Sequence, residues 1–432
     1  RPRPRGQRAA CRPGRVGARG PRRRRGRSAR QQRPHRVERV GLGRGLVRAV
    51  AQHPGEAQRD PTPAELAQME ALVEKAMQEG AVGISTGLIY VPGTYSKTPE
   101  VLALSKAAAK HGGVYASHIR NEGDHVADAI KEAISIGREA RMPVEISHFK
   151  VTYKPNWGRS VETIGLIEQA RREGLDVTVD QYPYVASSTT LDTTVPSWAF
   201  SGGRDSLHAR LSDPVIRQKI KKEMLASLKK SKLKNYDYAL VARYAPDTTY
   251  NGKTISQINT LKGRKAKARE EAETILEMIQ ANNRTQMVYF SMDEKDLVRI
   301  MQYPFNMFAS DAGIARFGAG MPHPRAYGTN ARVLGRYVRE QKVIRLEEAI
   351  RRMTSLPAQK FNLRDRGLLL PGMAADLVVF DEATVSDAAE FTNPHAYSKG
   401  FAYVLVNGEV TVSEGKHTGV RSGWTLRGAG MD

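Results

Sequence analysis

The stretches GVYASH (113–118), MPVEISH (142–148) and LDVTVDQYPY (175–184) decide the fold class. Each is a short run of strand-forming residues, and each follows a segment whose apolar residues recur at helical spacing. A similar run, AVGIS (81–85), comes before them. The expected strands start near residues 82, 114, 143 and 176, at intervals of 32, 29 and 33 residues. Strands and helices that alternate at about 30 residues predict parallel strands joined by crossover helices.

Both the TIM barrel and the doubly wound sheet show this alternation, and the residues at the strand ends distinguish between them. His118, His148 and Asp180 lie at the ends of three expected strands, and Asp311 follows the run NMFAS (306–310). Polar residues at the carboxyl ends of successive parallel strands converge on one face of a barrel. A doubly wound sheet more often carries a G-x-G-x-x-G turn after a strand, and the sequence has none. We therefore predict an α/β protein with a TIM-type (β/α)8 barrel.

The barrel is expected to occupy residues 51–360, with an interruption. Residues 204–290 break the strand–helix rhythm and contain two amphipathic helical stretches, at 216–234 and 266–280. We predict a helical insertion between the last two barrel strands that closes over the mouth of the barrel. The lysines of the first stretch fit a solvated helix face better than a binding patch.

The carboxyl-terminal part of the chain has a different pattern. Within residues 361–432, the runs ADLVVFD (375–381) and YVLVNGEVTV (403–412) are short, strand-like and bounded by turn residues. Short alternating runs of this kind predict a small β domain after the barrel.

Charge is concentrated at the amino terminus. The net charge is +23, but residues 1–50 hold 18 Arg, no Lys and one acidic residue, whereas the other 382 residues hold 50 basic and 44 acidic side chains. We expect residues 1–50 to be disordered, because a segment this rich in charge has too few apolar residues to form a core. The segment could also be an aberrant or out-of-frame amino terminus, because GC-rich codons specify Arg, Gly, Pro and Ala. The alternative for this segment is an arm that binds nucleic acid.

Composition excludes several classes of protein. No stretch approaches the 18–20 apolar residues of a membrane span. The single cysteine, Cys11, excludes a disulfide framework and a cysteine-rich zinc module. We therefore expect a cytoplasmic protein with no membrane partner; its oligomeric state stays open.

Two imidazoles and a carboxylate at strand ends are ligands that suit zinc. Neutral histidine nitrogen binds Zn²⁺ well, and a catalytic zinc site keeps one position open for water. We predict that His118, His148 and Asp311 hold a metal ion, and that Asp311 also takes the proton of the water. A single histidine at a strand end is more often a hydrogen-bonded structural residue, but three such residues on one βα repeat favour a metal site.

Four more residues are expected near the same mouth. Lys150 lies two positions after His148 and therefore on the same side of an extended segment. Arg325 lies in a loop rich in glycine and proline after Asp311, and either cation could bind a substrate carboxylate. Tyr90 and Tyr182 could supply hydroxyl groups, although tyrosines beside prolines often only pack loops.

Eight stretches of this chain, in order, resemble the N-acyl-D-amino-acid deacylase (D-aminoacylase) family of the amidohydrolase superfamily. The resemblance covers residues from about 55 to 432. The stretches are GAVGISTGLIYVPGTYSKTPEV, YASHIRNEG, VEISHFK, NWG, DVTVDQYPYVASSTTL, SDAG with PHPRAYGT, RGLLLPGMAADLVVFD and VLVNGEV.

The resemblance implies a zinc-dependent hydrolase that converts N-acyl-D-amino acids into a carboxylate and a D-amino acid. It implies that His118 and His148 bind zinc and that Asp311 is the general base near the metal. It places Lys150, Tyr182 and Arg325 near the substrate. Two further residues fall at pocket positions by the same resemblance: Tyr90 and Ser188.

Two motifs of the family are absent. The resemblance calls for an H-x-H pair on the first barrel strand, but no two histidines here are separated by one residue. It also calls for a cysteine zinc ligand in a Gly-rich motif, which the surroundings of Cys11 do not match. We therefore expect a barrel that is incomplete at its amino-terminal strands, with weaker zinc binding and impaired or absent hydrolysis.

Two alternatives remain at this point. The chain could be another amidohydrolase, such as a dihydroorotase-like or dipeptidase-like enzyme. It could also be a non-enzymatic remnant that binds nucleic acid through its basic arm.

Overall fold

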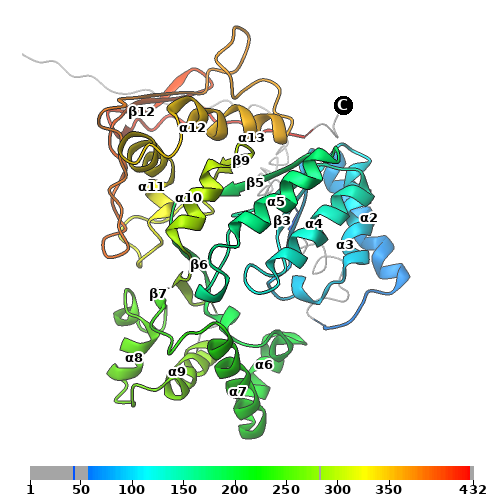
Figure 1. The fold of residues 1–432 in the computed structure, drawn as a ribbon, viewed down its shortest axis with the longest axis vertical. Helices are drawn as coiled ribbons and strands as arrows, with labels where there is room; N and C mark the ends of the chain where they lie inside the picture. The colour runs from blue at the N-terminus through cyan, green and yellow to red at the C-terminus, as the bar shows by residue number, and fades with distance from the viewer. Residues whose placement is uncertain (1–41, 44–56, 282–283, 429–432) are drawn as a thin grey trace, which may run out of the picture. The chain divides into compact units, whose positions relative to one another are not determined.

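A parallel sheet of six strands organises the computed structural model, which describes residues 42–43, 57–281 and 284–428 (Figure 1). The strand order is β1-β2-β3-β4-β5-β9, and every neighbouring pair is parallel. The strands are β1 (Leu42–Gly43), β2 (Gly83–Gly87), β3 (Val114–His118), β4 (Val144–Ile146), β5 (Val177–Gln181) and β9 (Asn306–Phe308). The α/β class and the predicted run of parallel βα units are confirmed, and the four predicted strand starts are at most one residue away from the observed ones.

The helices between these strands pack on the sheet and build its main core (Figure 1). They are α2 (Pro63–Gln78), α3 (Thr98–Ala109), α4 (Val126–Ala140) and α5 (Ser160–Arg172). Met69, Val73 and Met77 form the buried face of α2, at the three- and four-residue spacing of one helix face. Burial of such a side chain contributes about 1.5–3 kcal/mol. Packing of this kind fixes the strands, and therefore fixes the residues at their carboxyl ends.

The start of α2 shows why this helix begins where it does. The Thr62 hydroxyl accepts a hydrogen bond from the backbone N–H of Glu65, and the Glu65 carboxylate accepts one from the backbone N–H of Thr62. Pro63 occupies the first turn, where its missing N–H costs nothing. This reciprocal cap satisfies two backbone donors that have no partner within the helix.

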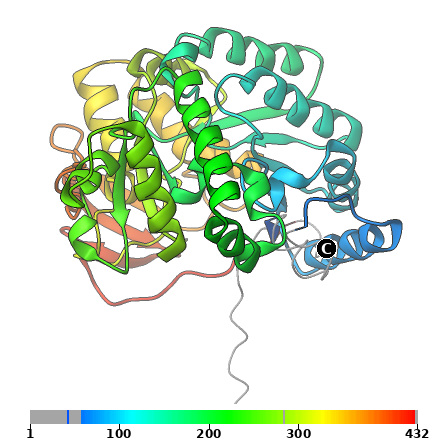
Figure 2. The same cartoon turned by 90° about the horizontal axis from the view of Figure 1, so that it is seen from below.

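Between β5 and β9 the chain forms a separate lobe with a core of its own. Its antiparallel sheet has the order β6-β8-β7, built from β6 (Ala186–Thr190), β7 (Ala239–Arg243) and β8 (Gln286–Phe290). Its helices are α6 (Gly203–Ser212), α7 (Pro214–Lys230), α8 (Ile255–Leu261) and α9 (Ala268–Ala281), drawn in green in Figure 2. Short 3-10 turns lie at Leu191–Thr194, Ser197–Phe200 and Thr248–Tyr250. The predicted helical insertion at 204–290 therefore needs a correction: the lobe also contains a three-stranded sheet and already begins at β6.

After β9 the chain returns to helices and then to a small β sheet. These helices are α11 (Arg325–Arg332), α12 (Leu346–Met353) and α13 (Ser355–Lys360), with a π-helix at Val333–Glu340. Helix α10 (Glu294–Gln302) lies before β9, between β8 and β9. The small sheet is antiparallel, in the order β10-β11-β12-β13. Its strands are β10 (Leu377–Phe380), β11 (Phe401–Val406), β12 (Glu409–Ser413) and β13 (Lys416–His417). The predicted carboxyl-terminal β structure is confirmed.

All the described residues belong to one compact unit, and the boundary predicted between residues 360 and 361 stays a prediction. Among the helices of the described residues, none combines the length and the apolar character that crossing a bilayer requires. The predictions for residues 1–50 fall outside the described residues, apart from the two residues of β1.

Candidate functional site

The carboxyl ends of β3 and β4 bring two histidines together. His118 is the last residue of β3, and His148 follows β4 by two residues. The two strands are paired in register, with Ser117 opposite Ile146. As a result, the imidazole rings lie edge to face with their centroids 4.2 Å apart. The sequence prediction that these strand ends meet at one edge of the sheet agrees with this geometry.

A carboxylate joins the two imidazoles. Oε1 of Glu122 lies 3.6 Å from Nε2 of His118 and 3.2 Å from Nδ1 of His148. One ligand atom from each of the three residues lies within 4.8 Å of the other two. Two imidazole nitrogens and one carboxylate oxygen form a ligand set of the kind that catalytic zinc sites use.

The charge states of these groups suit metal binding. Burial lowers the pKa of His118 well below its usual value, and the opposing attraction of Glu122 does not offset this, so the ring is neutral at pH 7. Burial alone would raise the pKa of Glu122, but Lys150, His118 and His148 outweigh it and lower that pKa. Nε2 of His118 is buried and has no hydrogen-bond partner among the described residues. A neutral imidazole with an unused nitrogen and an ionised carboxylate fit a zinc ion.

The backbone around His148 is held in an unusual conformation. His148 has a φ of +41°, in the left-handed region that side chains other than glycine rarely adopt. Its backbone N–H donates a 2.7 Å hydrogen bond to Oδ1 of Asp180, which lies on β5. Asp180, which the sequence placed at a strand end, therefore positions the backbone that carries the second imidazole.

Lys150 is buried against the same group. Its Nζ lies 2.5 Å from Oε1 of Glu122, 2.8 Å from Nδ1 of His148 and 2.7 Å from the His148 carbonyl oxygen. Burial would lower the pKa of Lys150, but the charge of Glu122 outweighs this and raises it. The predicted substrate cation thus lies at the site, and its ammonium group is bound to the candidate metal ligands.

Asp311 does not belong to the group formed by His118, Glu122 and His148. It follows β9 by three residues and has a φ of +47°. Its Oδ2 lies 2.9 Å from Nη1 of Arg325, and its side chain is 39% exposed. Asp311 lines the same cavity but is not among the three residues whose ligand atoms lie within 4.8 Å of one another, so its predicted role as a metal ligand stays a prediction.

Arg325 is the first residue of α11 and is buried. Its guanidinium lies over the ring of Tyr182, with 4.5 Å between the guanidinium carbon and the ring centroid. Its backbone N–H donates to Nδ1 of His323, whose Nε2 lies 2.9 Å from the carbonyl oxygen of Ala186 and donates to it. Arg325 also forms the ion pair with Asp311, and its predicted contact with the substrate stays a prediction.

The remaining predicted residues surround the cavity. The ring of Tyr90 lies 4.7 Å from that of His118, centroid to centroid, and its hydroxyl accepts a hydrogen bond from Thr189. Burial raises the pKa of Tyr90 to about 12. Tyr182 is almost fully buried, with Nζ of Lys150 5.7 Å from its ring centroid. The Ser188 hydroxyl donates to the carbonyl oxygen of Met287 across the lobe sheet.

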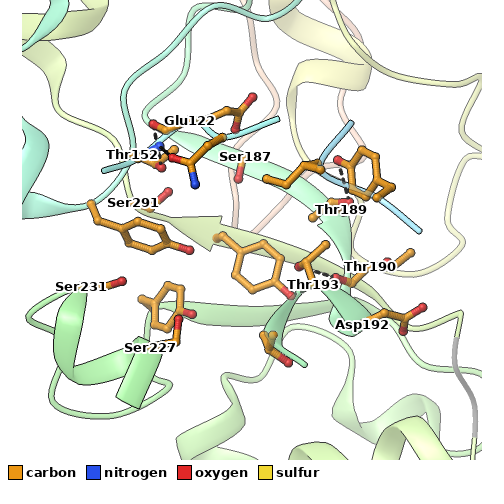
Figure 3. Close-up of a pocket in the computed structure, with 18 of the residues that line it drawn as sticks. Glu122, Thr152, Ser187, Thr189, Thr190, Asp192, Thr193, Ser227, Ser231 and Ser291 are labelled. Carbon is orange, nitrogen blue, oxygen red and sulfur yellow. Dashed lines mark hydrogen bonds between the residues drawn. The ribbon is translucent and has the colours of Figure 1, made fainter. Parts of the chain in front are cut away.

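Glu122 is a candidate metal ligand that sequence reasoning missed. It lies four residues after His118, on the loop that follows β3 rather than at the strand end. Thr152 holds this loop, since its backbone N–H and its hydroxyl both donate to the Glu122 carbonyl oxygen, at 2.8 and 3.0 Å (Figure 3). The signal available in the sequence was an acidic residue on the loop directly after a strand-end histidine.

The lobe between β5 and β9 supplies the opposite wall of a cavity of about 420 Å³. Ser227 and Ser231, on and just after α7, lie across the cavity from Glu122 (Figure 3). Tyrosines line the space between them, with the rings of Tyr238 and Tyr289 5.8 Å apart. The volume falls in the range of small-molecule sites. The arrangement can therefore hold an organic substrate between a candidate metal group and an aromatic wall.

Comparisons with known proteins agree with this architecture. The model of the Amidohydrolase family matches residues 45–412. D-aminoacylase of Alcaligenes xylosoxydans xylosoxydans is 36% identical over 385 residues, which cover 89% of this chain and 69% of that protein. N-acyl-D-glutamate deacylase of the same organism is 35% identical, with coverage of 85% and 65%. The chain thus spans about two thirds of the length of these curated relatives.

A solved structure of a relative is also similar to this chain. N-acyl-D-glutamate deacylase from Bordetella bronchiseptica, crystallised with zinc and a phosphonate inhibitor, matches with a TM-score of 0.72 and 34% identity. The match covers 89% of this chain and 70% of that one.

Proposed function

Because this chain belongs to the amidohydrolase family, we propose that it hydrolyses the amide bond of N-acyl-D-amino acids with the help of a zinc ion. The products are a carboxylate and a free D-amino acid. The preference for the D enantiomer is taken from the curated relatives, which are deacylases of D-amino acids by name.

The proposal rests on one observation. His118, Glu122 and His148 bring a ligand atom each to within 4.8 Å of one another, at the carboxyl ends of adjacent parallel strands and on the wall of a substrate-sized cavity. Active sites of βα barrels lie at this edge of the sheet. We also propose that the six parallel strands are part of a TIM-type barrel, which this placement of polar residues supports.

The residues of the chain then have distinct tasks. His118, Glu122 and His148 would hold the zinc ion, which supplies a Lewis acid that polarises the amide carbonyl and lowers the pKa of a water molecule. Asp311 pairs with Arg325 at 2.9 Å and lines the cavity. We assign it the transfer of a proton from the attacking water to the leaving amine, the work of a general base and then a general acid. Arg325 fixes the direction of the carboxylate.

Tyr90 is assigned a role in substrate binding. The high pKa keeps its phenol protonated, so its hydroxyl can donate to a substrate oxygen while it accepts from Thr189. The aromatic wall of the lobe would receive the acyl group or the amino-acid side chain.

The test compares enantiomers on protein saturated with zinc. N-acetyl-D-leucine and N-acetyl-L-leucine are supplied separately, and the released amino group is measured for the wild type and for His148→Ala. The proposal predicts turnover of the D compound that His148→Ala abolishes, with little turnover of the L compound. Equal turnover of both compounds, or none by wild-type protein that carries stoichiometric zinc, would overturn it.

A further inference from the structure

The loop that joins Asp311 to Arg325 has little backbone structure of its own. Residues 312–324 include three glycines and two prolines. Among the described residues, no backbone N–H of residues 311–318 donates to a backbone carbonyl oxygen, and the first such bond of the loop comes from Ala319. The position of the stretch that carries Asp311 therefore depends on contacts with other parts of the chain.

An imidazole from the carboxyl-terminal part of the chain supplies such a contact. Nδ1 of His395 accepts a 3.2 Å hydrogen bond from the backbone N–H of Gly318, and Nε2 of the same ring lies 2.9 Å from the carbonyl oxygen of Gly320. A backbone N–H can only donate and a carbonyl oxygen can only accept, so the two contacts fix the tautomer with the proton on Nε2. His395 thus holds the turn at residues 318–320 with both of its ring nitrogens.

The same imidazole is joined to helix α11. The hydroxyl of Tyr327 donates to Nδ1 of His395 at 3.0 Å, and Oγ of Ser398 donates to the carbonyl oxygen of Tyr327 at 2.8 Å. Tyr327 lies two residues after Arg325, in the first turn of α11. His395 therefore connects the loop that begins at Asp311 with the helix that carries the partner of Asp311.

Aromatic contacts follow the same path. The ring of Phe317 stacks on that of Tyr397, with centroids 5.2 Å apart, and lies edge to face with Tyr327 at 6.2 Å. Phe317 is 53% exposed and Tyr397 is 66% exposed, so these rings add little to a hydrophobic core. Their contact ties the loop to the segment that carries His395.

We propose that His395 is a positioning residue for the general base. It fixes the loop at residues 318–320 against α11, and the loop in turn holds the Asp311 carboxylate in the direction that proton transfer requires. His395 is not among the residues that line the cavity, so it acts through Asp311 and not on the substrate. The inference rests on the proposed function and gives the carboxyl-terminal part of the chain a task in it.

A double-mutant cycle tests whether His395 acts through Asp311. With N-acetyl-D-leucine and protein saturated with zinc, His395→Ala should lower kcat by about tenfold and leave KM nearly unchanged, because a misplaced base slows proton transfer. In the Asp311→Asn background the same substitution should have no further effect, because the group on which it acts is gone. Unchanged kcat in His395→Ala, or equal losses in both backgrounds, would overturn the proposal.

Two further variants separate the hydrogen bonds from a general role in the fold. His395→Asn keeps an acceptor near the position of Nδ1 and should recover part of the kcat that His395→Ala loses; no recovery would contradict the proposal. His417→Ala is the matched control. Nδ1 of His417 also accepts a backbone N–H, that of Gly419 at 2.8 Å, but in the small sheet. Its removal should leave kcat unchanged.

Tryptic cleavage after Arg316 reports on the loop without any substrate. Arg316 is exposed. In His395→Ala the new amino terminus at Phe317, followed by mass spectrometry, should form at least about fivefold faster than in the wild type, because cleavage follows local opening. Cleavage after Lys229, which is exposed on α7, should keep its rate. An unchanged rate after Arg316, or faster cleavage at both sites, would overturn the proposal.

Failure of this inference and failure of the proposed function give different results. Turnover of N-acetyl-D-leucine that does not respond to His395→Ala would overturn only the role of His395. Faster cleavage after Arg316 in His395→Ala, together with no turnover by the wild type, would overturn the hydrolase and leave His395 as the anchor of the loop.

Discussion

Asp311 and Arg325 form a 2.9 Å ion pair on the cavity wall, outside the group made by His118, Glu122 and His148. Arg325 is buried, and the ring of Tyr182 lies against its guanidinium, so the arginine is fixed while Asp311 stays open to the cavity. This geometry separates the residue assigned to proton transfer from the residues assigned to the metal.

Asp311→Asn should therefore uncouple catalysis from metal binding. The amide cannot accept a proton, so we expect kcat to fall by about 10²- to 10⁴-fold, the usual contribution of a general base. Zinc content should stay at the wild-type level, because the carboxylate pairs with Arg325 rather than with the metal group. Steady-state kinetics and metal analysis of the same preparation check both parts. Loss of zinc together with activity would show that Asp311 is a metal ligand.

Glu122→Gln should weaken metal binding. The substitution removes the negative charge that two imidazoles and one ammonium surround, and we expect zinc affinity to fall at least about tenfold. Competition with a chelator of known affinity measures this. Glu74→Gln is a suitable control, because Glu74 pairs with Lys110 on the surface, where such pairs contribute little to stability. Equal zinc affinity in both variants would exclude Glu122 as a ligand.

Asp192 lines the cavity and should make stability depend on pH. Burial raises the pKa of Asp192 to about 6, and its Oδ1 has no hydrogen-bond partner among the described residues. The folded protein therefore holds this proton more tightly than the unfolded chain, whose carboxyl has a pKa of about 3.9. The corresponding stability is fully present below about pH 4 and is lost as the pH rises through about 6.

Asp192→Asn should abolish that loss. Since two pKa units correspond to about 3 kcal/mol at most, the variant should gain stability relative to wild type between pH 4 and pH 7. Urea unfolding at several pH values measures the difference. Asp128→Asn is the control, since the Asp128 side chain is 75% exposed. If the free energy of unfolding depends on pH in the same way for the wild type and for Asp192→Asn, Asp192 is not the source of the pH dependence.

The sequence predicts the parallel sheet well because its strands are buried between helices. Runs such as VEIS and DVTV stand out against helices with one apolar face, and turn glycines separate some of them. The lobe sheet is different. Residues 186–190 read ASSTT, which carry no apolar signal, and β8 joins them only after about a hundred residues of chain. Pairing over such a distance leaves no local pattern to read.

The position of a site residue could be predicted from the sequence where that residue lies at the end of a strand. His118 ends β3, so the direction of the sheet fixes its position. Glu122 lies on an irregular loop, and the sequence pattern of a loop does not show which way its side chains point. Asp311 lies three residues beyond β9 with a left-handed backbone, so its carboxylate turns to Arg325, a contact that spacing could not show. The roles of these residues in catalysis stay predictions until the variants are measured.

We propose that His118, Glu122 and His148 bind one zinc ion between them. The most direct test of this proposal is the zinc content of the purified chain after equilibration with a small excess of zinc and removal of unbound metal, for the wild type, His118→Ala and His148→Ala. We expect about one ion per wild-type chain and a loss of bound zinc in each variant while the variants remain folded. Wild-type zinc content retained in either variant, or none in the wild type, would contradict it.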